Sequence, residues 1–462
     1  MSFDQLLFPV VFLPLSVLLF RAVPAKAKKG VLLALSLVFI AWGSLLDLAV
    51  IVLSVLFNYL AGLRLDDLRR AADAKRARTS VTISALVNVC LLAFFKYFNF
   101  AASTLHIGAR LSMAAPVGVS FFTFSALSFL FDVYRGRVKT PGTLADFALY
   151  ICFFPKLVSG PIIQFRDMRP QFDAPVITRG RTETGMRMFV LGLAKKVLIA
   201  NTLGLTFNAA TADPKGASAL TAWLGTLAYT FMLYYDFSGY SDMAEGLGYV
   251  FGFRLPRNFK YPYCAESVSD FWRRWHASLG AWFRDYIYIP LGGSRAGDGK
   301  TVRNLLIVWA LTGVWHGANW TFLVWGLYHG VIIVLEKFVF RGVIDRVPKV
   351  LRRAVTFLLA MFGWVFFYAG SIGEAFTHLG RMFAFSHFAD ETGLYLLGSV
   401  WPLLIAAGIG ATPLVRAQCL KWAKRGKPWL NVVIIILFAA LLALSIAGLV
   451  SQTYTSFLYA QF

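Results

Sequence analysis

The chain has 462 residues, of which 58% are hydrophobic and only 15% are charged. A soluble globular domain carries about 25% charged residues, so this composition excludes an ordinary soluble protein and predicts a polytopic membrane protein. The formal net charge of +22 does not indicate nucleic-acid binding, because the lysines and arginines collect in short loops between apolar runs. The four cysteines are far apart and lack metal-ligand spacing, so we expect free thiols rather than disulfides or a metal centre.

Apolar runs alternate with basic loops in the first third of the chain. We expect a first spanning helix over residues 6–20 with the N-terminus outside, because the basic flank follows the apolar run. Residues 31–63 are too long for one crossing, and Gly43-Ser44 predicts a break that makes a helical hairpin. The next spans are expected over residues 81–105 and 116–131.

The apolar run at residues 144–163 contains Pro155 and Pro161. Proline removes a backbone donor and clashes with a helix interior, so we expect a broken or re-entrant segment. A polar outside loop is expected over residues 371–392. Altogether we expect an all-α polytopic membrane protein, with about eleven spanning helices plus re-entrant or interfacial pieces, forming one domain over residues 1–462. The later spans are expected over residues 189–209, 220–237, 302–315, 320–340, 354–369, 394–415 and 429–450.

His316 follows an apolar run over residues 305–314. A polar side chain at membrane depth is costly, so it indicates a functional site. A neutral imidazole there can accept a proton from a substrate hydroxyl as a general base. The alternative is a core histidine that is hydrogen-bonded to a backbone carbonyl.

His276 lies 40 positions before His316, among tryptophans that recur at helical spacing from Trp272 to Trp282. This spacing predicts one amphipathic helix, interfacial or dipping into the bilayer, with His276 beside its apolar stripe. We expect His276 to orient a thioester donor or the acceptor, and the alternative is an incidental histidine in an aromatic belt. No metal ligand set is predicted, because neither histidine has a short His spacing or a Cys, Asp or Glu partner. His329 would lie near the opposite face of an unbroken helix and is expected to be structural; loops are expected to hold His106, His378 and His387.

Basic residues crowd around Gly292-Gly293. Arginine forks suit the phosphates of a nucleotide-bearing acyl donor such as coenzyme A, although the positive-inside rule alone would also produce this cluster. Asp236 lies in a nearly apolar segment, where a carboxylate is costly unless it is paired, and we expect an arginine or a histidine as its partner. The residues predicted to bind substrate or donor are Arg273, Arg284, Lys300, Trp275, Trp315, Asn319 and Asp236.

Several segments between residues 96 and 330 match the motifs of one family. In this respect the chain resembles the membrane-bound O-acyltransferase family, specifically its bacterial branch that O-acetylates polysaccharides such as alginate. The matching segments are Lys96-Tyr-Phe-Asn-Phe100, Pro116-Val-Gly-Val-Ser-Phe-Phe-Thr-Phe124, Asp132-Val-Tyr-Arg-Gly136, Phe153-Phe-Pro-Lys-Leu-Val-Ser-Gly-Pro161, Asp236-Phe-Ser-Gly-Tyr-Ser-Asp-Met243, Phe271-Trp-Arg-Arg-Trp-His276, Arg284-Asp-Tyr-Ile-Tyr-Ile-Pro-Leu-Gly-Gly293 and Trp315-His-Gly-Ala-Asn-Trp-Thr-Phe322.

The resemblance implies that His316 matches the family's catalytic histidine and His276 its second active-site position. It further implies a helical bundle around a tunnel in the bacterial inner membrane. It implies no permanently bound cofactor, a cytoplasmic thioester donor such as acetyl-CoA, and periplasmic partner proteins that complete transfer to an exopolysaccharide. Two alternatives stay open at this point. One is a transporter or scaffold that moves acyl groups or polymer without chemistry, and the other is a lipid or protein O-acyltransferase of the same family.

Overall fold

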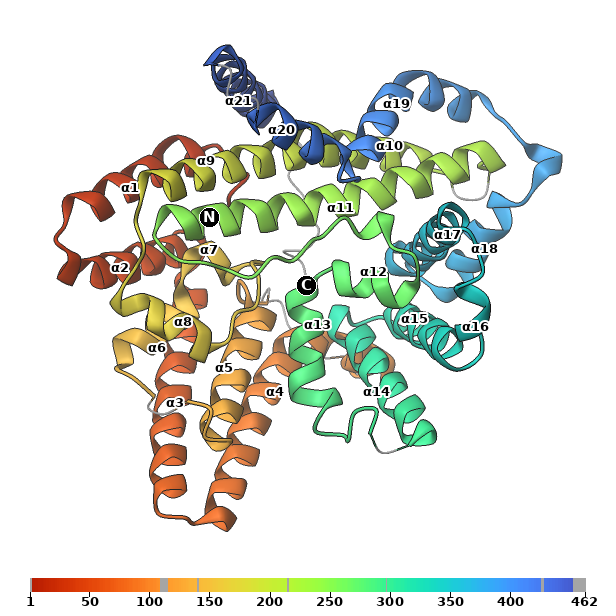
Figure 1. Cartoon of the computed structure of the whole chain (residues 1–462). Coiled ribbons are helices and arrows are strands. Elements are labelled where there is room, and N and C mark those ends of the chain that lie inside the picture. The colour runs from red at the N-terminus through yellow and green to blue at the C-terminus, as the bar shows by residue number, and fades with distance from the viewer. Residues whose placement is uncertain are drawn as a thin grey trace. The chain divides into compact units, whose positions relative to one another are not determined.

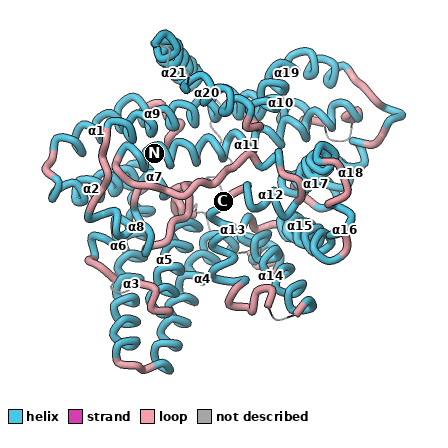
Figure 2. Tube along the Cα trace, in the orientation of Figure 1, coloured by secondary structure: helices cyan, strands magenta, loops and turns pink. Residues whose placement is uncertain are grey.

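The computed structural model describes residues 2–108, 115–138, 141–213, 216–295, 297–424 and 428–451. Every regular element within these residues is a helix, as Figures 1 and 2 show. The expected all-α polytopic fold is therefore confirmed, and the expected runs at the N-terminus and before Tyr134 form the shorter apolar helices Phe8–Ala22 and Val119–Tyr134. Among the described residues, seven helices are long and apolar enough to cross a bilayer: Leu45–Arg70, Ala74–Thr104, Arg179–Ala210, Trp320–Phe338, Lys349–Tyr368, Glu391–Gly410 and Trp429–Ser451.

The chain divides into two compact units, and each is described by itself. Within the described residues, the first unit comprises residues 2–189 and 240–257, and the second comprises residues 190–239 and 258–451. Two helices, α9 (Arg179–Ala194) and α11 (Ala219–Val250), contribute residues to both units. The prediction of one membrane-embedded domain over the whole chain stays a prediction.

The break expected at Gly43-Ser44 is present in the first unit. Ser44 has an extended backbone between α2 (Ala25–Gly43) and α3 (Leu45–Arg70), and its hydroxyl accepts a hydrogen bond from Asp47 N at 3.2 Å. A serine in this position caps the start of a helix, because it satisfies an amide that has no partner in the first turn. The other elements of this unit are η1 (Phe8–Phe12), α1 (Leu13–Ala22), α4 (Ala74–Thr104), α5 (Val119–Tyr134), α6 (Leu144–Cys152), α7 (Phe154–Leu157) and α8 (Phe165–Asp173).

Helices α3 and α4 are joined by a pair of buried amides. Asn58 Nδ2 donates to Asn88 Oδ1 at 3.1 Å, and Asn88 Nδ2 donates back to Asn58 Oδ1 at 2.8 Å. Side-chain hydrogen bonds of this kind hold helices together in a bilayer, where apolar contact with lipid competes with apolar contact between helices. The pair therefore fixes the register of the α3–α4 hairpin.

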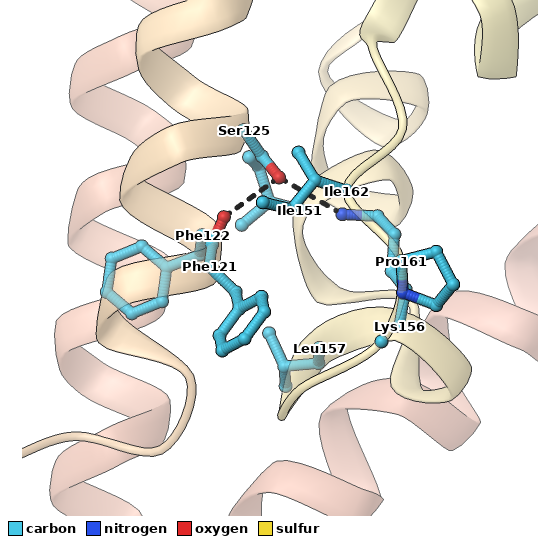
Figure 3. A pocket seen from close by; sticks show the side chains of 9 residues that line it. Phe121, Phe122, Ser125, Ile151, Lys156, Leu157, Pro161 and Ile162 are labelled. Carbon is cyan, nitrogen blue, oxygen red and sulfur yellow. Dashed lines mark hydrogen bonds between the residues drawn. The ribbon is translucent and has the colours of Figure 1, made fainter. Parts of the chain in front are cut away.

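The segment at residues 144–163 is broken, as its prolines predict. Helix α6 ends at Cys152, Phe153 leaves the helical conformation, and the one-turn helix α7 carries Pro155. Lys156 on α7 is buried, and its Nζ donates to Ser125 Oγ at 3.3 Å and lies 4.6 Å from the centre of the Tyr150 ring. Figure 3 shows this amine directed towards Ser125 in a crevice walled mainly by apolar side chains.

Lys156 predicts a pH-dependent stability. It lies outside the seven candidate spans, and burial lowers the pKa of its amine from 10.5 to about 7. Between these two pH values the unfolded chain binds more protons than the folded protein, so stability rises with pH across that window. We expect Lys156→Met to raise the melting temperature at pH 7 and to flatten its rise towards pH 10, measured by thermal unfolding in detergent.

A matched control for this experiment is Lys349→Met, which removes an exposed amine. It should leave both the melting temperature and its pH dependence as in the wild-type protein. An Lys156→Met protein with the wild-type pH dependence would show that this amine is charged in the folded state.

In the second unit, α14 (Asp298–His316) and α15 (Trp320–Phe338) form a close hairpin. A Cβ atom on Gly313 would lie 2.3 Å from Phe322 O, and one on Gly326 would lie 2.3 Å from Trp309 O, so the two backbones touch at these glycines. Small residues allow such close approach between helices in a membrane. The other elements of this unit are η2 (Lys195–Ala200), α10 (Asn201–Ala210), η3 (Pro262–Cys264), α12 (Val268–Arg274), α13 (Ala277–Phe283), η4 (Arg284–Tyr288), α16 (Arg341–Ile344), α17 (Lys349–Tyr368), α18 (Ile372–Met382), η5 (Phe385–His387), α19 (Glu391–Gly410), α20 (Leu414–Lys424) and α21 (Pro428–Ser451).

The prediction of a loop over residues 371–392 is wrong for the first half of this segment, which forms helix α18 (Ile372–Met382). Ser371 caps this helix by accepting a hydrogen bond from Glu374 N at 3.2 Å. His378, expected in a loop, lies on the buried face of α18, and its Nε2 is 2.9 Å from Thr226 Oγ1. The helix was missed because most of its residues are polar or small, and only Ala375, His378 and Met382 are buried.

Candidate active site

The candidate site lies in the second unit, where the tryptophan-rich segment before and after His276 is not one helix. Helix α12 ends at Arg274, Trp275 is extended, and His276 has φ 45° and ψ 49° before α13 begins at Ala277. The single amphipathic helix expected here is therefore wrong. A left-handed backbone at a residue other than glycine costs on the order of 1–3 kcal/mol, and such residues cluster at functional sites.

Asn258 holds the turn at His276. Its Oδ1 accepts hydrogen bonds from Ser278 N at 3.2 Å and from Ser278 Oγ at 2.6 Å, and it lies 3.4 Å from His276 Nδ1. The backbone of Asn258 adds a bond, because its carbonyl accepts from Ala277 N at 3.0 Å. The contacts compensate the strained backbone and favour the imidazole tautomer that carries its proton on Nδ1. No sequence spacing pointed to Asn258.

We expect Asn258→Ala to reduce kcat by about 10–10²-fold, because a displacement of about 1 Å in a catalytic group costs rates of this order. Steady-state kinetics of the purified protein, with its melting temperature measured alongside, provide the check. Asn258→Asp is the matched control, since it keeps an oxygen acceptor in the same place and should retain more activity. A wild-type kcat in the alanine variant would show that this turn does not position His276.

Helix α12 is also fixed at its first turn by a carboxylate from α15. Glu336 accepts hydrogen bonds from Val268 N at 2.5 Å, Ser269 N at 2.9 Å and Ser269 Oγ at 2.7 Å. A negative charge at a helix N-terminus is favourable, because the first amides have no partner within the helix. The segment that leads to His276 is thus tied to α15 at one end and to Asn258 at the other.

His276 is buried, with a relative exposure of 2%. Its ring is perpendicular to that of Phe237, with centroids 4.7 Å apart, and its centroid lies 6.4 Å from that of Trp315. Burial lowers the pKa of His276 to about 3. The imidazole is therefore neutral near pH 7, and it can donate or accept a hydrogen bond but does not supply a positive charge.

His316 is the last residue of α14 and is 1% exposed. Its ring lies against Trp315 at 4.7 Å, Trp325 at 4.8 Å and Phe367 at 5.3 Å, measured between centroids. Trp315 thus contacts His316 on one side and approaches His276 on the other. The structure therefore places the two histidines, far apart in sequence, in one buried aromatic cluster.

The predicted basic residues lie outside this cluster. Arg273 is 72% exposed with its guanidinium 3.5 Å from Asp270, and Arg284 is 62% exposed with its Nε 2.8 Å from Asp285. Lys300 is also exposed, in the first turn of α14. These side chains are available to a ligand at the surface rather than to the buried rings.

Asp236 has the basic partner that its burial requires, but the partner is a lysine rather than an arginine or a histidine. Lys196 Nζ lies 2.6 Å from Asp236 Oδ1, and the two side chains are 1% and 3% exposed. Lys196 belongs to the π-helical segment η2, a conformation that is frequent at functional sites. Because Asp236 precedes Phe237, this ion pair is one residue from the ring that contacts His276.

Asn319 and Trp275 have structural partners. Asn319 Oδ1 accepts from Thr321 N at 3.1 Å, which caps α15, and its Nδ2 donates to Gly370 O at 2.8 Å. Trp275 is 1% exposed and stacks on Phe271, with ring centroids 5.6 Å apart. Both residues support the cluster, and their described contacts are with the protein itself.

His329 joins the aromatic cluster, although the sequence predicted a structural position remote from His316. The chain reverses at Gly317 between α14 and α15, so a count of helical faces from His316 does not apply. The His329 ring lies 5.4 Å from Trp325, the same indole that contacts His316. The separate spans expected over residues 302–315 and 320–340 already implied a break after His316, so the count of faces along one unbroken helix was inconsistent with them.

Comparison with known proteins agrees with the family resemblance of the sequence motifs. The family model for the membrane-bound O-acyltransferase family matches residues 32–373. The chain is 37% identical to the probable alginate O-acetylase AlgI of Azotobacter vinelandii, with 100% of both chains covered. It is 34% identical to the peptidoglycan O-acetyltransferase of Helicobacter pylori, over 82% of this chain and 79% of that protein. It is 28% identical to the teichoic acid D-alanyltransferase of Bacillus subtilis, over 48% of this chain and 59% of that protein.

Proposed function

Because this chain belongs to the membrane-bound O-acyltransferase family, we propose that it moves acetyl groups for the O-acetylation of an exopolysaccharide such as alginate. It is a multi-pass membrane O-acyltransferase. The proposed location is the bacterial inner membrane. The proposed donor is acetyl-CoA from the cytoplasm, bound as a substrate rather than kept as a cofactor, and periplasmic partner proteins complete transfer to the polymer.

The chemical part of the proposal is supported by the position of the His276 and His316 rings, which both lie near the ring of Trp315. We assign His316 as the general base, which takes the proton from the acceptor hydroxyl. The hydroxyl oxygen then attacks the thioester carbonyl, the carbon–sulfur bond breaks, and the departing thiolate takes the proton from His316. General-base help contributes about 10²–10⁴-fold, so alignment of the two substrates supplies much of the remaining acceleration.

His276 is assigned the second role in this scheme. Its neutral imidazole directs the Nδ1 proton towards Asn258, so Nε2 can accept a hydrogen bond from the acceptor hydroxyl without placing a charge in the cluster. Trp315 contacts His316 and approaches His276, so it is the best placed of the other predicted residues to touch a reactant. Trp275, Asn319 and Asp236 would act on substrate binding through the shape of the cluster.

Arg273, Arg284 and Lys300 are proposed to hold the phosphates of the donor. Their exposure supports this role, because phosphates that remain partly hydrated need accessible partners. The relatives named above are acetylases or transferases by name, which favours chemistry over a transporter or scaffold. The acceptor differs among their names, so another acceptor of the same family remains the second candidate.

The proposal is tested with purified protein in lipid nanodiscs, radiolabelled acetyl-CoA and a periplasmic acceptor fraction from an alginate-producing bacterium. We expect thiol release that depends on the acceptor and label that reaches the polymer fraction. Label found in lipid or in peptidoglycan fragments would identify a different acceptor. Polymer transport without thiol release would refute the acyl-transfer scheme for this chain.

A further inference from the structure

His329 on α15 is fully buried, and neither of its ring nitrogens has a hydrogen-bond partner among the described residues. The ring is enclosed by aromatic side chains: its centroid lies 5.0 Å from Trp272, 5.4 Å from Trp325 and 5.8 Å from Trp309. An imidazole that loses its water and gains no partner destabilises the fold, whereas an apolar side chain would avoid that cost. Stability therefore does not account for a histidine at this position.

A glycine on the neighbouring helix makes room for the imidazole of His329. A Cβ atom on Gly363 of α17 would lie 2.5 Å from His329 Nε2, so the ring fits only because this position is a glycine. Glycine inside a helix weakens that helix relative to alanine. Two features that lower the stability of the fold, a buried imidazole without a hydrogen bond and a glycine within a helix, thus occur side by side.

The position of His329 connects it with both proposed catalytic histidines. The Trp325 ring lies 4.8 Å from His316 at 87° and 5.4 Å from His329 at 78°, so both imidazoles meet the same indole edge-to-face. Trp272, the closest ring to His329 among the tryptophans, lies on α12, the helix that leads to His276. His329 therefore contacts one indole that packs against His316 and another on the helix that leads to His276.

The indole N–H groups around His329 indicate what kind of group could hydrogen-bond there. The Nε1 atoms of Trp272, Trp325 and Trp364 are buried and have no hydrogen-bond partner among the described residues. An indole N–H can only donate, whereas a neutral imidazole offers one donor and one acceptor. A hydroxyl oxygen matches this set, because it can accept from an indole and donate to the imidazole, and buried polar groups without partners are commonly satisfied by such an oxygen.

We propose that His329 is a third functional histidine, a positioning residue that holds a hydroxyl oxygen beside Trp325 and thereby orients His316 for the reaction. The inference rests on the proposed function of His316. The oxygen comes either from an ordered water molecule or from the acceptor. With water, loss of His329 lowers kcat and leaves the KM for the acceptor unchanged; with the acceptor hydroxyl, the same loss also raises that KM.

The deciding variant is His329→Phe, measured as full-length protein in nanodiscs with acetyl-CoA and the acceptor. The proposal expects at least a tenfold loss in kcat per folded molecule, with the melting temperature measured on the same sample. His329→Gln, which keeps a donor and an acceptor, should recover part of that loss. A merely structural histidine would give the opposite pattern, in which the phenylalanine variant is as active as wild type and the glutamine variant is no better. That pattern would overturn the proposal.

Wild-type protein and His316→Ala are run beside these variants, so that failure of the proposed function is recognised separately. Absence of thiol release from the wild-type protein would count against the acyl-transfer scheme, whereas active wild-type, inactive His316→Ala and active His329→Phe would count against the role of His329 alone. If His329→Phe is not recovered folded, Gly363→Ala provides the second arm. Its methyl group displaces the imidazole, and a folded Gly363→Ala protein with wild-type kcat would likewise overturn the proposal.

Discussion

Replacing His316 with alanine is expected to reduce acyl transfer by about 10²–10⁴-fold, the range that loss of a general base produces. The residue is the last of α14 and is enclosed by the rings of Trp315, Trp325 and Phe367, so the rate must be compared per folded molecule. The measurement is thiol release from acetyl-CoA per folded molecule, with protein amount and melting temperature determined on the same sample.

His378→Ala is the matched control for this result, because it removes another buried histidine of the same unit. His378 lies on α18 and contacts Thr226 and Tyr368, outside the cluster around Trp315. We expect this variant to lose some stability and to keep the wild-type rate per folded molecule. Retained acyl transfer in His316→Ala, or an equal loss in both variants, would contradict the assignment of His316 as the base.

Lys196→Met is expected to lower the free energy of unfolding by about 3–5 kcal/mol, because it leaves the carboxylate of Asp236 buried without its ion-pair partner. The ion pair is almost fully buried, so water cannot replace the lost ammonium group. Equilibrium unfolding of the purified protein in mixed micelles, with helix content as the signal, measures this difference.

The double variant Lys196→Met/Asp236→Leu separates the destabilisation caused by one unpaired buried charge from the net contribution of the intact ion pair to the free energy of unfolding. Removing both charges is expected to recover most of the lost stability, since apolar replacements of a buried pair are often neutral or stabilising. If the two substitutions were instead additive, each side chain would contribute independently, and the proposed coupling through the 2.6 Å contact would be wrong. Because Asp236 precedes Phe237, which contacts His276, the activity of the double variant also reports whether this pair matters for the site.

Most parts of the fold that local sequence determines were predicted correctly, although helix α18 was missed. Runs of apolar residues identify helices at membrane depth, and Ser44 and the prolines of the segment at residues 144–163 place breaks where the chain cannot continue a helix. The need of Asp236 for a cationic partner also followed from the cost of a buried carboxylate alone.

Apart from α18, the features that were missed depend on residues far away in sequence. Helical periodicity predicted one helix through His276, but hydrogen bonds that Asn258 accepts from the following residues stabilise a left-handed residue there. The partner of Asp236 is Lys196, 40 positions earlier, and neither residue's spacing reveals the other. His329 was assigned to the opposite face by counting along one unbroken helix, although separate spans were expected before and after Gly317.

Residues of the candidate site divide in the same way. His276, His316 and Trp315 could be chosen from the sequence, because histidines among apolar and aromatic residues are conspicuous. Their mutual arrangement could not, since it arises from the packing of α12, α14 and α15. The surface position of Arg273 and Arg284 also appears only in the folded chain, where each pairs with a nearby aspartate.

The proposed mechanism requires His276 and His316 to contact the same reactant. The direct test is a cryo-electron microscopy structure of the full chain in nanodiscs with a non-cleavable ketone analogue of acetyl-CoA. We predict density for the carbonyl end of the analogue in contact with both imidazoles and beside Trp315. Density that placed this carbonyl away from both rings, with the two histidines enclosed by protein alone, would contradict it.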